Sequence, residues 1–183
     1  MRFISTPIPD LFIVELIPFS DERGSFTRLY CMEEFRSIGL VRPFTQINIS
    51  KNIHGGTIRG LHFQFPPVAE DKLIRCSRGR IFDVVVDLRH QSPTFFQWFG
   101  LELSHESDRQ LFVPRGFAHG FQTLCDHCEV VYHHTEYYQP NLQGGVRYDD
   151  PKLDIAWPLP VSCISQKDLE LPVWTPSMRG LES

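Results

Sequence analysis

The sequence lacks several features that would mark membrane, secreted or nucleic-acid-binding proteins. No apolar run in its 183 residues is long enough to span a bilayer, and residues 1–7 lack the apolar region of a signal peptide. The five cysteines are an odd number without a regular framework, which favours a reducing, cytoplasmic location. The net charge of −4 argues against nucleic acid as a partner. We therefore expect a soluble protein with neither a membrane nor a nucleic-acid partner.

Helix signals are also scarce, and short alternating segments separated by turns fill most of the chain. The segment 32–36 is expected to form a short helix that ends before Gly39. We expect strands at 12–17, 25–30, 45–50, 59–64, 72–76, 80–88, 99–103, 110–113, 117–124 and 129–135. The residues Ser77 to Gly79 carry a hairpin signal between two of these strands. This pattern predicts an all-β sandwich or barrel, organised as a single domain over residues 1–183.

The segment 59–64, Arg-Gly-Leu-His-Phe-Gln, displays a titratable histidine at a defined point of a strand. Strict alternation would place Arg59 on one face and His62 with Gln64 on the other, unless the strand bulges at Gly60. An unperturbed imidazole titrates near pH ~6.5, so His62 is a candidate general base. A hydrogen-bonded core histidine is the alternative for any single histidine.

Four further residues could act with His62. Lys72 opens the next strand, Asp83 lies in the one after it, and Tyr132 lies in a later strand. His119 stands among small residues that would let a ligand approach. A base, a cation, a phenol and a second imidazole suit proton abstraction next to a carbonyl.

A metal site is the competing interpretation of the same histidines. His62 and His119 resemble the ligands of metal-binding β-sandwiches, but Gln64 stands where a second histidine would be expected and is a poor ligand for transition metals. The pair Cys125 and Cys128 resembles half of a zinc site, and a second cysteine pair is missing. We favour a polar hairpin turn between Leu124 and Glu129, and we expect no metal.

The same residues belong to a series of motifs that spans nearly the whole chain and resembles the dTDP-4-dehydrorhamnose 3,5-epimerase family of nucleotide-sugar epimerases. The matching segments, in family order, are 59–64, 71–73, 81–89, 92–94, 113–121, 135–138, 149–151 and 155–158. The resemblance implies a cupin-type jelly-roll β-sandwich with short peripheral helices, a homodimer, and no metal or organic cofactor.

The resemblance also implies roles for individual residues. His62 matches the base that removes the proton beside the sugar ketone, and Asp168 matches its carboxylate partner. Tyr132 matches the acid that returns a proton from the opposite face, and Lys72 matches the group that stabilises the enolate oxygen. Asp83 is expected to support the site. The substrate implied is a nucleotide-diphosphate 4-keto-6-deoxy sugar, inverted at carbon 3, carbon 5 or both.

Further positions match residues that contact the substrate or stand at its binding site in the family. They are Arg23, Phe26, Arg28, Gln46, Asn48, Arg59, His119, Tyr138, Gln143 and Lys167. Phe26 and Tyr138 match positions that stack on the nucleotide base. Gln143 stands where an acidic residue is common, and His133 with His134 replace the usual residues beside the acid.

One departure bears on the nucleotide. Arg28 occupies a position that is usually Glu in the family and that faces the thymine edge. Thymine nitrogen 3 carries a proton and needs an acceptor, whereas cytosine nitrogen 3 needs a donor, and arginine has only donors. Arg28 therefore suggests a preference for a CDP-sugar over a dTDP-sugar, unless its side chain turns to a phosphate or to solvent.

Two other functions compete with an epimerase. One is a nucleotide-sugar-binding cupin without turnover, which would have no need for His62, Lys72, Tyr132 and Asp168 together. The other is a metal-dependent cupin enzyme.

Overall fold

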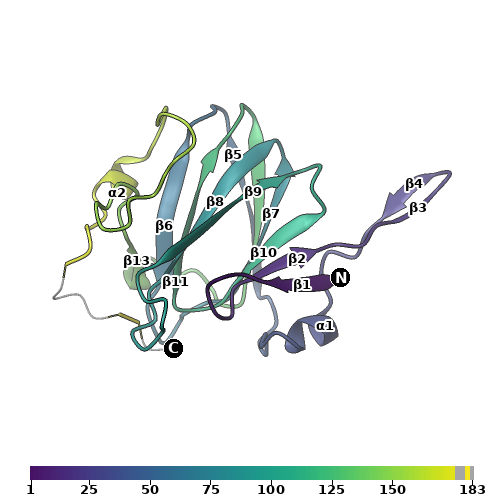
Figure 1. The fold of residues 1–183 in the computed structure, drawn as a ribbon, viewed down its shortest axis with the longest axis horizontal. Coiled ribbons are helices and arrows are strands. Elements are labelled where there is room, and N and C mark those ends of the chain that lie inside the picture. Colours follow the sequence, from purple (N-terminus) through teal and green to yellow (C-terminus); the bar gives the residue numbers. More distant parts are fainter. Residues whose placement is uncertain (176–179, 182–183) are drawn as a thin grey trace.

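The structure is a computed structural model that describes residues 1–175, 180 and 181. It is built from β-strands that form two facing sheets (Figure 1). The first sheet has six strands in the order β1-β2-β10-β7-β12-β5, and the second has five in the order β13-β6-β11-β8-β9. Neighbouring strands in both sheets run antiparallel. The expected cupin-type jelly-roll β-sandwich is confirmed.

The strands are short and follow one another closely along the chain. The first sheet contains β1 (Arg2–Ser5), β2 (Phe12–Glu15), β5 (Gln46–Asn52), β7 (Lys72–Arg78), β10 (Arg109–Val113) and β12 (Cys128–His134). The second contains β6 (Ile58–Gln64), β8 (Arg80–Asp87), β9 (Trp98–Ser104), β11 (Phe117–Thr123) and β13 (Gln143–Gly145). A separate two-stranded hairpin, β3 (Phe19–Asp21) with β4 (Gly24–Phe26), projects from the body of the molecule (Figure 1).

Helix is confined to short peripheral pieces. They are α1 (Met32–Arg36), the 3-10 turn η1 (Pro140–Leu142) and α2 (Gln166–Leu169). The expected helix at 32–36 is confirmed, whereas β1, β3, β13, η1 and α2 were not expected from the sequence. These five elements have only three or four residues each, too few to show a period. The strand expected at 25–30 was wrong beyond Phe26, where β4 ends, because its partner β3 offers only three residues for pairing. None of the helices in the described part of the chain is long and apolar enough to cross a membrane.

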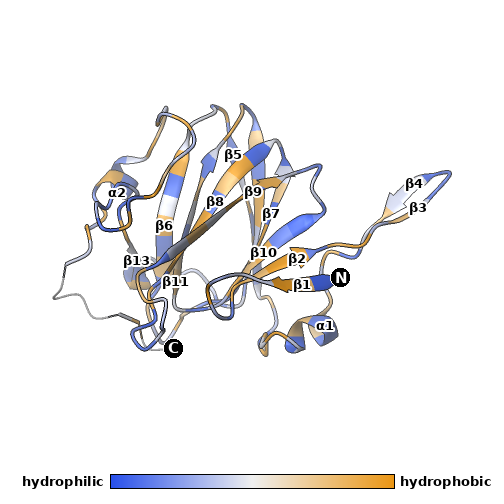
Figure 2. Ribbon diagram, viewed as in Figure 1, coloured by the Kyte–Doolittle hydropathy of each residue, from blue (hydrophilic) through white to orange (hydrophobic). Residues whose placement is uncertain are grey.

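Apolar side chains fill the space between the sheets and also cover their outer faces. Ile74 and Leu111 from the first sheet pack with Val85 and Phe121 from the second, all at most 1% exposed. Phe35 of α1 packs on the outer face of the first sheet. Chain segments near the C-terminal end cover the outer face of the second sheet with side chains that include Leu153, Trp157 and Trp174. The outer faces are covered only in part, and the strands accordingly carry both hydrophobic and hydrophilic residues along their length (Figure 2).

Two turns expected as hairpins instead connect the two sheets. The turn at Gly79 joins β7 of the first sheet to β8 of the second, and the residues after Leu124 join β11 of the second sheet to β12 of the first. Both hairpin predictions were wrong because turn residues report a chain reversal and not the sheet to which the next strand belongs. This alternation between sheets carries candidate residues from both sheets into one interior.

Candidate active site

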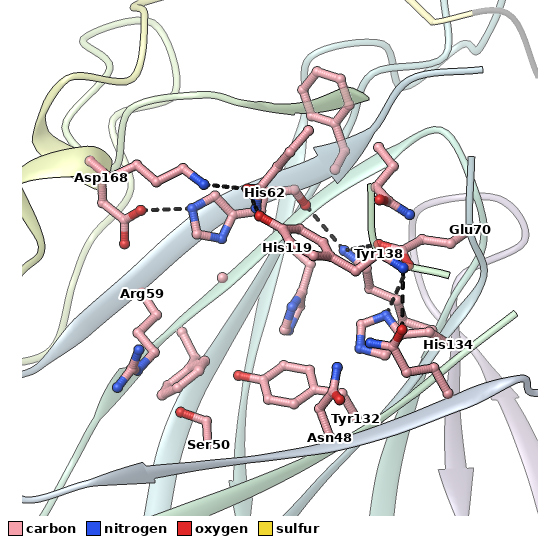
Figure 3. Close-up of a pocket in the computed structure, with 18 of the residues that line it drawn as sticks. Asn48, Ser50, Arg59, His62, Glu70, His119, Tyr132, His134, Tyr138 and Asp168 are labelled. Atoms are coloured by element: carbon pink, nitrogen blue, oxygen red, sulfur yellow. Dashed lines mark hydrogen bonds and ion pairs between the residues drawn. The ribbon is translucent and has the colours of Figure 1, made fainter. Parts of the chain in front are cut away.

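A pocket with a cavity volume of about 380 Å³ opens between the two sheets (Figure 3). The second sheet contributes His62 and His119, and the first sheet contributes Tyr132 and Lys72. Asp168 closes one side from α2. The arrangement brings together groups that lie on five separate elements of the chain.

His62 is held by a carboxylate from the other end of the sequence. Its Nε2 atom lies 2.7 Å from Oδ1 of Asp168, whose Oδ2 accepts a hydrogen bond from the backbone N–H of Gly60 at 3.2 Å. Ser165 caps α2 by accepting a hydrogen bond from the Asp168 backbone N–H, which fixes the start of this short helix. Burial would raise the pKa of Asp168, but the hydrogen bond from His62, its charge and the backbone donor of Gly60 together lower it below its usual value. An ionised Asp168 accepts from Nε2–H, so Nδ1 of a neutral His62 is the nitrogen free to take a proton.

A bulge in β6 puts Arg59 on the same side of the strand as His62. His62 lies opposite His119 of β11, and Arg59 lies opposite Phe121, so two residues of β6 face the single residue Gly120. The bulge contains Gly60, whose φ is +113° and whose added Cβ would lie 2.6 Å from the Cα of Gly120. The exception to strict alternation that the glycine suggested is therefore present, and both Arg59 and His62 line the pocket.

His119 forms a second histidine–carboxylate pair beside the first. Its Nε2 atom lies 2.9 and 3.0 Å from the two carboxylate oxygens of Asp83, which is completely buried behind it. Burial raises the pKa of Asp83, although the neighbouring His119 opposes this effect. Asp83 therefore binds His119 from the side away from the pocket and does not itself line the cavity.

Tyr132 approaches the pocket from the sheet opposite His62 (Figure 3). Its ring packs edge to face with His119 at a centroid distance of 5.9 Å and nearly parallel to His134 at 6.0 Å. Burial raises the pKa of Tyr132 strongly, and the negative charge of Asp83 raises it further, against smaller effects of Arg59 and Ser50. The phenol is therefore protonated and can serve as an acid.

Lys72 spans the gap between the sheets. It belongs to β7 of the first sheet, and its Nζ atom donates to the main-chain oxygen of His62 in the second sheet at 3.3 Å. Nζ also lies 3.2 Å from Oε1 of Glu70, whose Oε2 lies 2.9 Å from Nδ1 of His134. A cation thus stands beside the candidate base.

The structure brings most of the predicted site residues to this pocket. Those that line it are Gln46, Asn48, Arg59, His62, Lys72, His119, Tyr132, Tyr138, Gln143, Lys167 and Asp168. At the rim, the side chain of Gln143 accepts hydrogen bonds from Lys167 and from the hydroxyl of Tyr138. These two hydrogen bonds link the three predicted residues.

Three predicted residues lie away from the pocket of their own chain. Arg23 is on the β3–β4 hairpin and pairs with Asp21, Phe26 is 77% exposed on the same hairpin, and Arg28 follows the hairpin. The Arg28 guanidinium is bound to Glu34 of α1 at 2.9 Å.

Sequence reasoning missed other residues of the pocket wall. Glu70, His134 and Ser50 line the cavity and were not among the predicted site residues. Each lies two positions from a residue that was predicted, namely Lys72, Tyr132 and Asn48. The period of two along a strand could therefore have found Ser50 and His134, which share strands with their predicted neighbours.

Two features weighed for metal binding have other partners here. The Gln64 amide donates to the main-chain oxygens of Val68 and Tyr137 and accepts from the N–H of Gln139. Cys125 and Cys128 are free thiols 3.5 Å apart in the connection between β11 and β12.

Comparison with known proteins places this site in a family. The family profile described as dTDP-4-dehydrorhamnose 3,5-epimerase matches residues 5–175. A protein of that name from Salmonella typhimurium is 45% identical over 175 residues, which cover 94% of this chain and 95% of the relative.

Solved structures agree with this assignment. The dTDP-4-dehydrorhamnose 3,5-epimerase from Bacillus anthracis, determined with TDP and PPi bound, has a TM-score of 0.91 and 45% identity, covering 94% of this chain and 99% of that one. The dTDP-6-deoxy-D-glucose-3,5-epimerase from Legionella pneumophila, in complex with dTDP-4-keto-L-rhamnose, has a TM-score of 0.86 and 40% identity, covering 92% and 89%.

The fold and the relatives together define an isomerase of the carbohydrate epimerase type built on a cupin-like β-sandwich. The chain belongs to the dTDP-4-dehydrorhamnose 3,5-epimerase family.

Proposed function

We propose that this protein inverts carbons 3 and 5 of dTDP-4-dehydro-6-deoxyglucose to give dTDP-4-dehydrorhamnose. The observation that carries the proposal is the placement of His62 and Tyr132 on opposite sheets, facing one pocket. A group on one face of a planar enolate can only return the proton to that face, so inversion needs a base and an acid on opposite sides. The names of the relatives support the choice of substrate.

In this mechanism His62 takes the proton beside the ketone through Nδ1, and the ionised Asp168 stabilises the imidazolium that forms. Lys72 stabilises the negative oxygen of the enolate. Tyr132 then delivers a proton from the other face, and its protonated phenol is ready for that step. The ketone at carbon 4 acidifies the protons on carbons 3 and 5, so one pocket can invert both.

The test is to incubate the protein with dTDP- and CDP-4-dehydro-6-deoxyglucose in parallel and to identify the sugar formed by NMR. We expect a doubly inverted sugar from the dTDP substrate. A singly inverted product would overturn the 3,5 assignment, and turnover of the CDP substrate alone would overturn the nucleotide. Binding of either substrate without any product would favour the non-catalytic cupin. A stoichiometric transition metal in the purified protein, with activity lost on chelation, would favour the metal-dependent cupin.

The position of Arg28 bears on the nucleotide. Its guanidinium is paired with Glu34, and Arg28 does not line the pocket of its own chain. A single chain therefore gives no support for the predicted contact between Arg28 and cytosine. The preference for a CDP-sugar therefore stays a prediction that the parallel incubation decides.

We propose further that two copies form a homodimer in which the β3–β4 hairpin of each enters the pocket of the other. Three substrate-binding candidates, Arg23, Phe26 and Arg28, lie on or directly after this hairpin and away from their own pocket. Phe19 and Phe26 on the hairpin are 71% and 77% exposed, which a second copy would cover. A cytoplasmic location is also proposed, since five free thiols persist in a reducing compartment.

Mixing two inactive variants tests this arrangement. His62→Asn disables the pocket and leaves the hairpin intact, whereas Arg23→Ala with Phe26→Ala disables the hairpin and leaves the pocket intact. After joint refolding we expect activity from roughly one quarter of the sites, since a mixed two-fold dimer has one complete site. No recovery, or a monomeric mass in sedimentation, would contradict the exchange of hairpins.

A further inference from the structure

The pocket holds a third histidine–carboxylate pair, His134 with Glu70, which the mechanism above does not use. Nδ1 of His134 lies 2.9 Å from Oε2 of Glu70. The side chains of Glu70 and His134 are only 9% and 14% exposed, and both line the cavity. A buried carboxylate beside a developing enolate is unfavourable in itself, so its presence needs a physical reason.

The contacts of Lys72 supply that reason. An ammonium group has three donors. One of them meets the main-chain oxygen of His62 at 3.3 Å, and another meets Oε1 of Glu70 at 3.2 Å. Because one acceptor lies in β6 and the other in the segment before β7, these two contacts also fix the direction of the third donor. The Lys72 side chain is 8% exposed and lines the pocket, so the third donor is the one left for a substrate oxygen.

His134 in turn fixes Glu70. Burial would raise the pKa of Glu70, but the charge of Lys72 and the hydrogen bond from His134 lower it, so the carboxylate is ionised and accepts from both neighbours. The His134 ring lies nearly parallel to the ring of Tyr132, with 21° between their planes. His134 therefore packs against the candidate acid while it binds the carboxylate that holds Lys72.

We propose that Glu70 is a positioning residue for this reaction, which aims the Lys72 ammonium at the enolate oxygen, and that His134 holds Glu70 in the required orientation. The inference rests on the proposed epimerase function. Glu70 acts through Lys72 and does not touch the reacting atoms. The competing role is a buried ion pair that only stabilises the fold.

A double-mutant cycle on turnover separates the two roles. The variants are Glu70→Gln, Lys72→Ala and the two combined, assayed for kcat and KM on the substrate that the wild type epimerises. A misdirected catalytic group costs up to roughly 10²-fold in rate, so we expect Glu70→Gln to lower kcat by roughly 10- to 100-fold with little change in KM. In the Lys72→Ala background the same substitution should have no further effect, because the group that Glu70 positions is absent. An unchanged kcat in Glu70→Gln, or an equal loss in both backgrounds, would overturn the proposal.

His134 and His133 form a matched pair of neighbours. His134→Gln should lower kcat, as Glu70→Gln does. His133→Gln should leave kcat unchanged, because His133 does not line the pocket and its Nδ1 instead lies 3.4 Å from the main-chain oxygen of Leu73. Equal effects of the two substitutions would contradict a specific role for His134.

A measurement without substrate tests the contact between Glu70 and Lys72 separately from the assigned reaction. The ¹⁵N-filtered NMR signal of the Lys72 ammonium should be visible in the wild type, because hydrogen bonds protect its protons from exchange, and it should broaden in Glu70→Gln. If wild-type protein fails to epimerise either substrate, the proposed function fails while this signal still decides whether Glu70 holds Lys72. An equally sharp signal in both proteins would overturn the positioning role.

Discussion

Asp168 and His62 are 106 residues apart in the sequence, yet Nε2 of His62 lies 2.7 Å from Oδ1 of Asp168. The contact is made possible by α2, which packs against β6 and begins at the capping residue Ser165. It leaves Nδ1 of the neutral imidazole as the site that accepts a proton. The pair therefore sets both the orientation and the tautomer of the candidate base.

Replacing Asp168 should lower turnover while the pocket still binds dTDP. Asp168→Asn keeps the shape of the side chain but can donate to Nε2, which would move the proton of His62 to Nδ1. We expect kcat to fall by roughly 10²- to 10⁴-fold, the range of general acid–base contributions. Steady-state kinetics together with binding of dTDP measures the effect. Unchanged kcat would contradict the assigned tautomer, and dTDP binding equal to wild type is the control for folding.

The same substitution should change the pH dependence of stability. The pKa of Asp168 is lower in the folded protein than its usual value because its partners outweigh burial. A lowered carboxyl pKa stabilises the fold above the unfolded value near ~3.9, and the contribution is lost as pH falls through the folded pKa. As the pH falls below about 4, the difference in free energy of unfolding between wild type and Asp168→Asn should shrink, because the carboxylate becomes protonated. Urea denaturation at a series of pH values measures it, and a difference that grows below about pH 4 would be the wrong sign.

Tyr132→Phe should separate proton removal from inversion. The phenol is assigned to the second proton transfer, so its loss should reduce formation of the epimer by roughly 10²-fold or more while deuterium from the solvent still enters the substrate. Mass spectrometry and NMR of the recovered sugar measure both quantities. Equal losses of wash-in and of epimer would contradict the assigned role.

The pH–rate profile gives an independent view of Tyr132. Burial and the charge of Asp83 raise the pKa of this phenol, so it stays protonated beyond pH ~10, where a free tyrosine ionises. The profile of kcat should therefore show no loss from tyrosine ionisation up to about pH 10. An alkaline fall near pH 9 that is present in wild type and absent from the residual activity of Tyr132→Phe would contradict this assignment.

Gly60 is predicted to be intolerant of any side chain. An added Cβ would lie 2.6 Å from the Cα of Gly120, and φ is +113°. We expect Gly60→Ala to lower the free energy of unfolding by about 2–5 kcal/mol, from overpacking of about 1–3 and backbone strain of about 1–2 kcal/mol. Gly39→Ala is the matched control, since φ there is +92° with nothing within 4 Å, and it should show only the backbone cost. Equal costs in the two variants, measured by chemical denaturation, would show that the close approach at Gly60 has no energetic effect.

Local patterns predicted most of the longer strands, since a period of two needs only neighbouring residues, but the strand expected at 25–30 ends at residue 26 and the short strands β1, β3 and β13 were missed. Alternation placed Gln46 with Asn48 on one face of β5, and both line the pocket. It could not determine which sheet receives each strand, so the turns after β7 and β11 were mistaken for hairpins. Strand assignment depends on long-range packing that turn residues do not encode.

The site was harder to predict where its residues come from irregular chain. Asp168 lies beyond the last strand, and only the family resemblance pointed to it. Glu70 precedes β7 and was missed, because a carboxylate outside the strands is ordinarily a solvated residue and its burial here depends on Lys72 and His134. The hairpin positions Arg23 and Phe26 were expected at the pocket and lie away from it in a single chain.

The most direct test of the account is deuterium wash-in on dTDP-4-dehydro-6-deoxyglucose, followed by proton NMR in deuterium oxide, with wild type and His62→Asn compared side by side. We expect wild type to exchange the protons at carbons 3 and 5 and His62→Asn to slow both exchanges by roughly 10²-fold or more. Exchange at both carbons that persists unchanged in His62→Asn would contradict the assignment of His62 as the base.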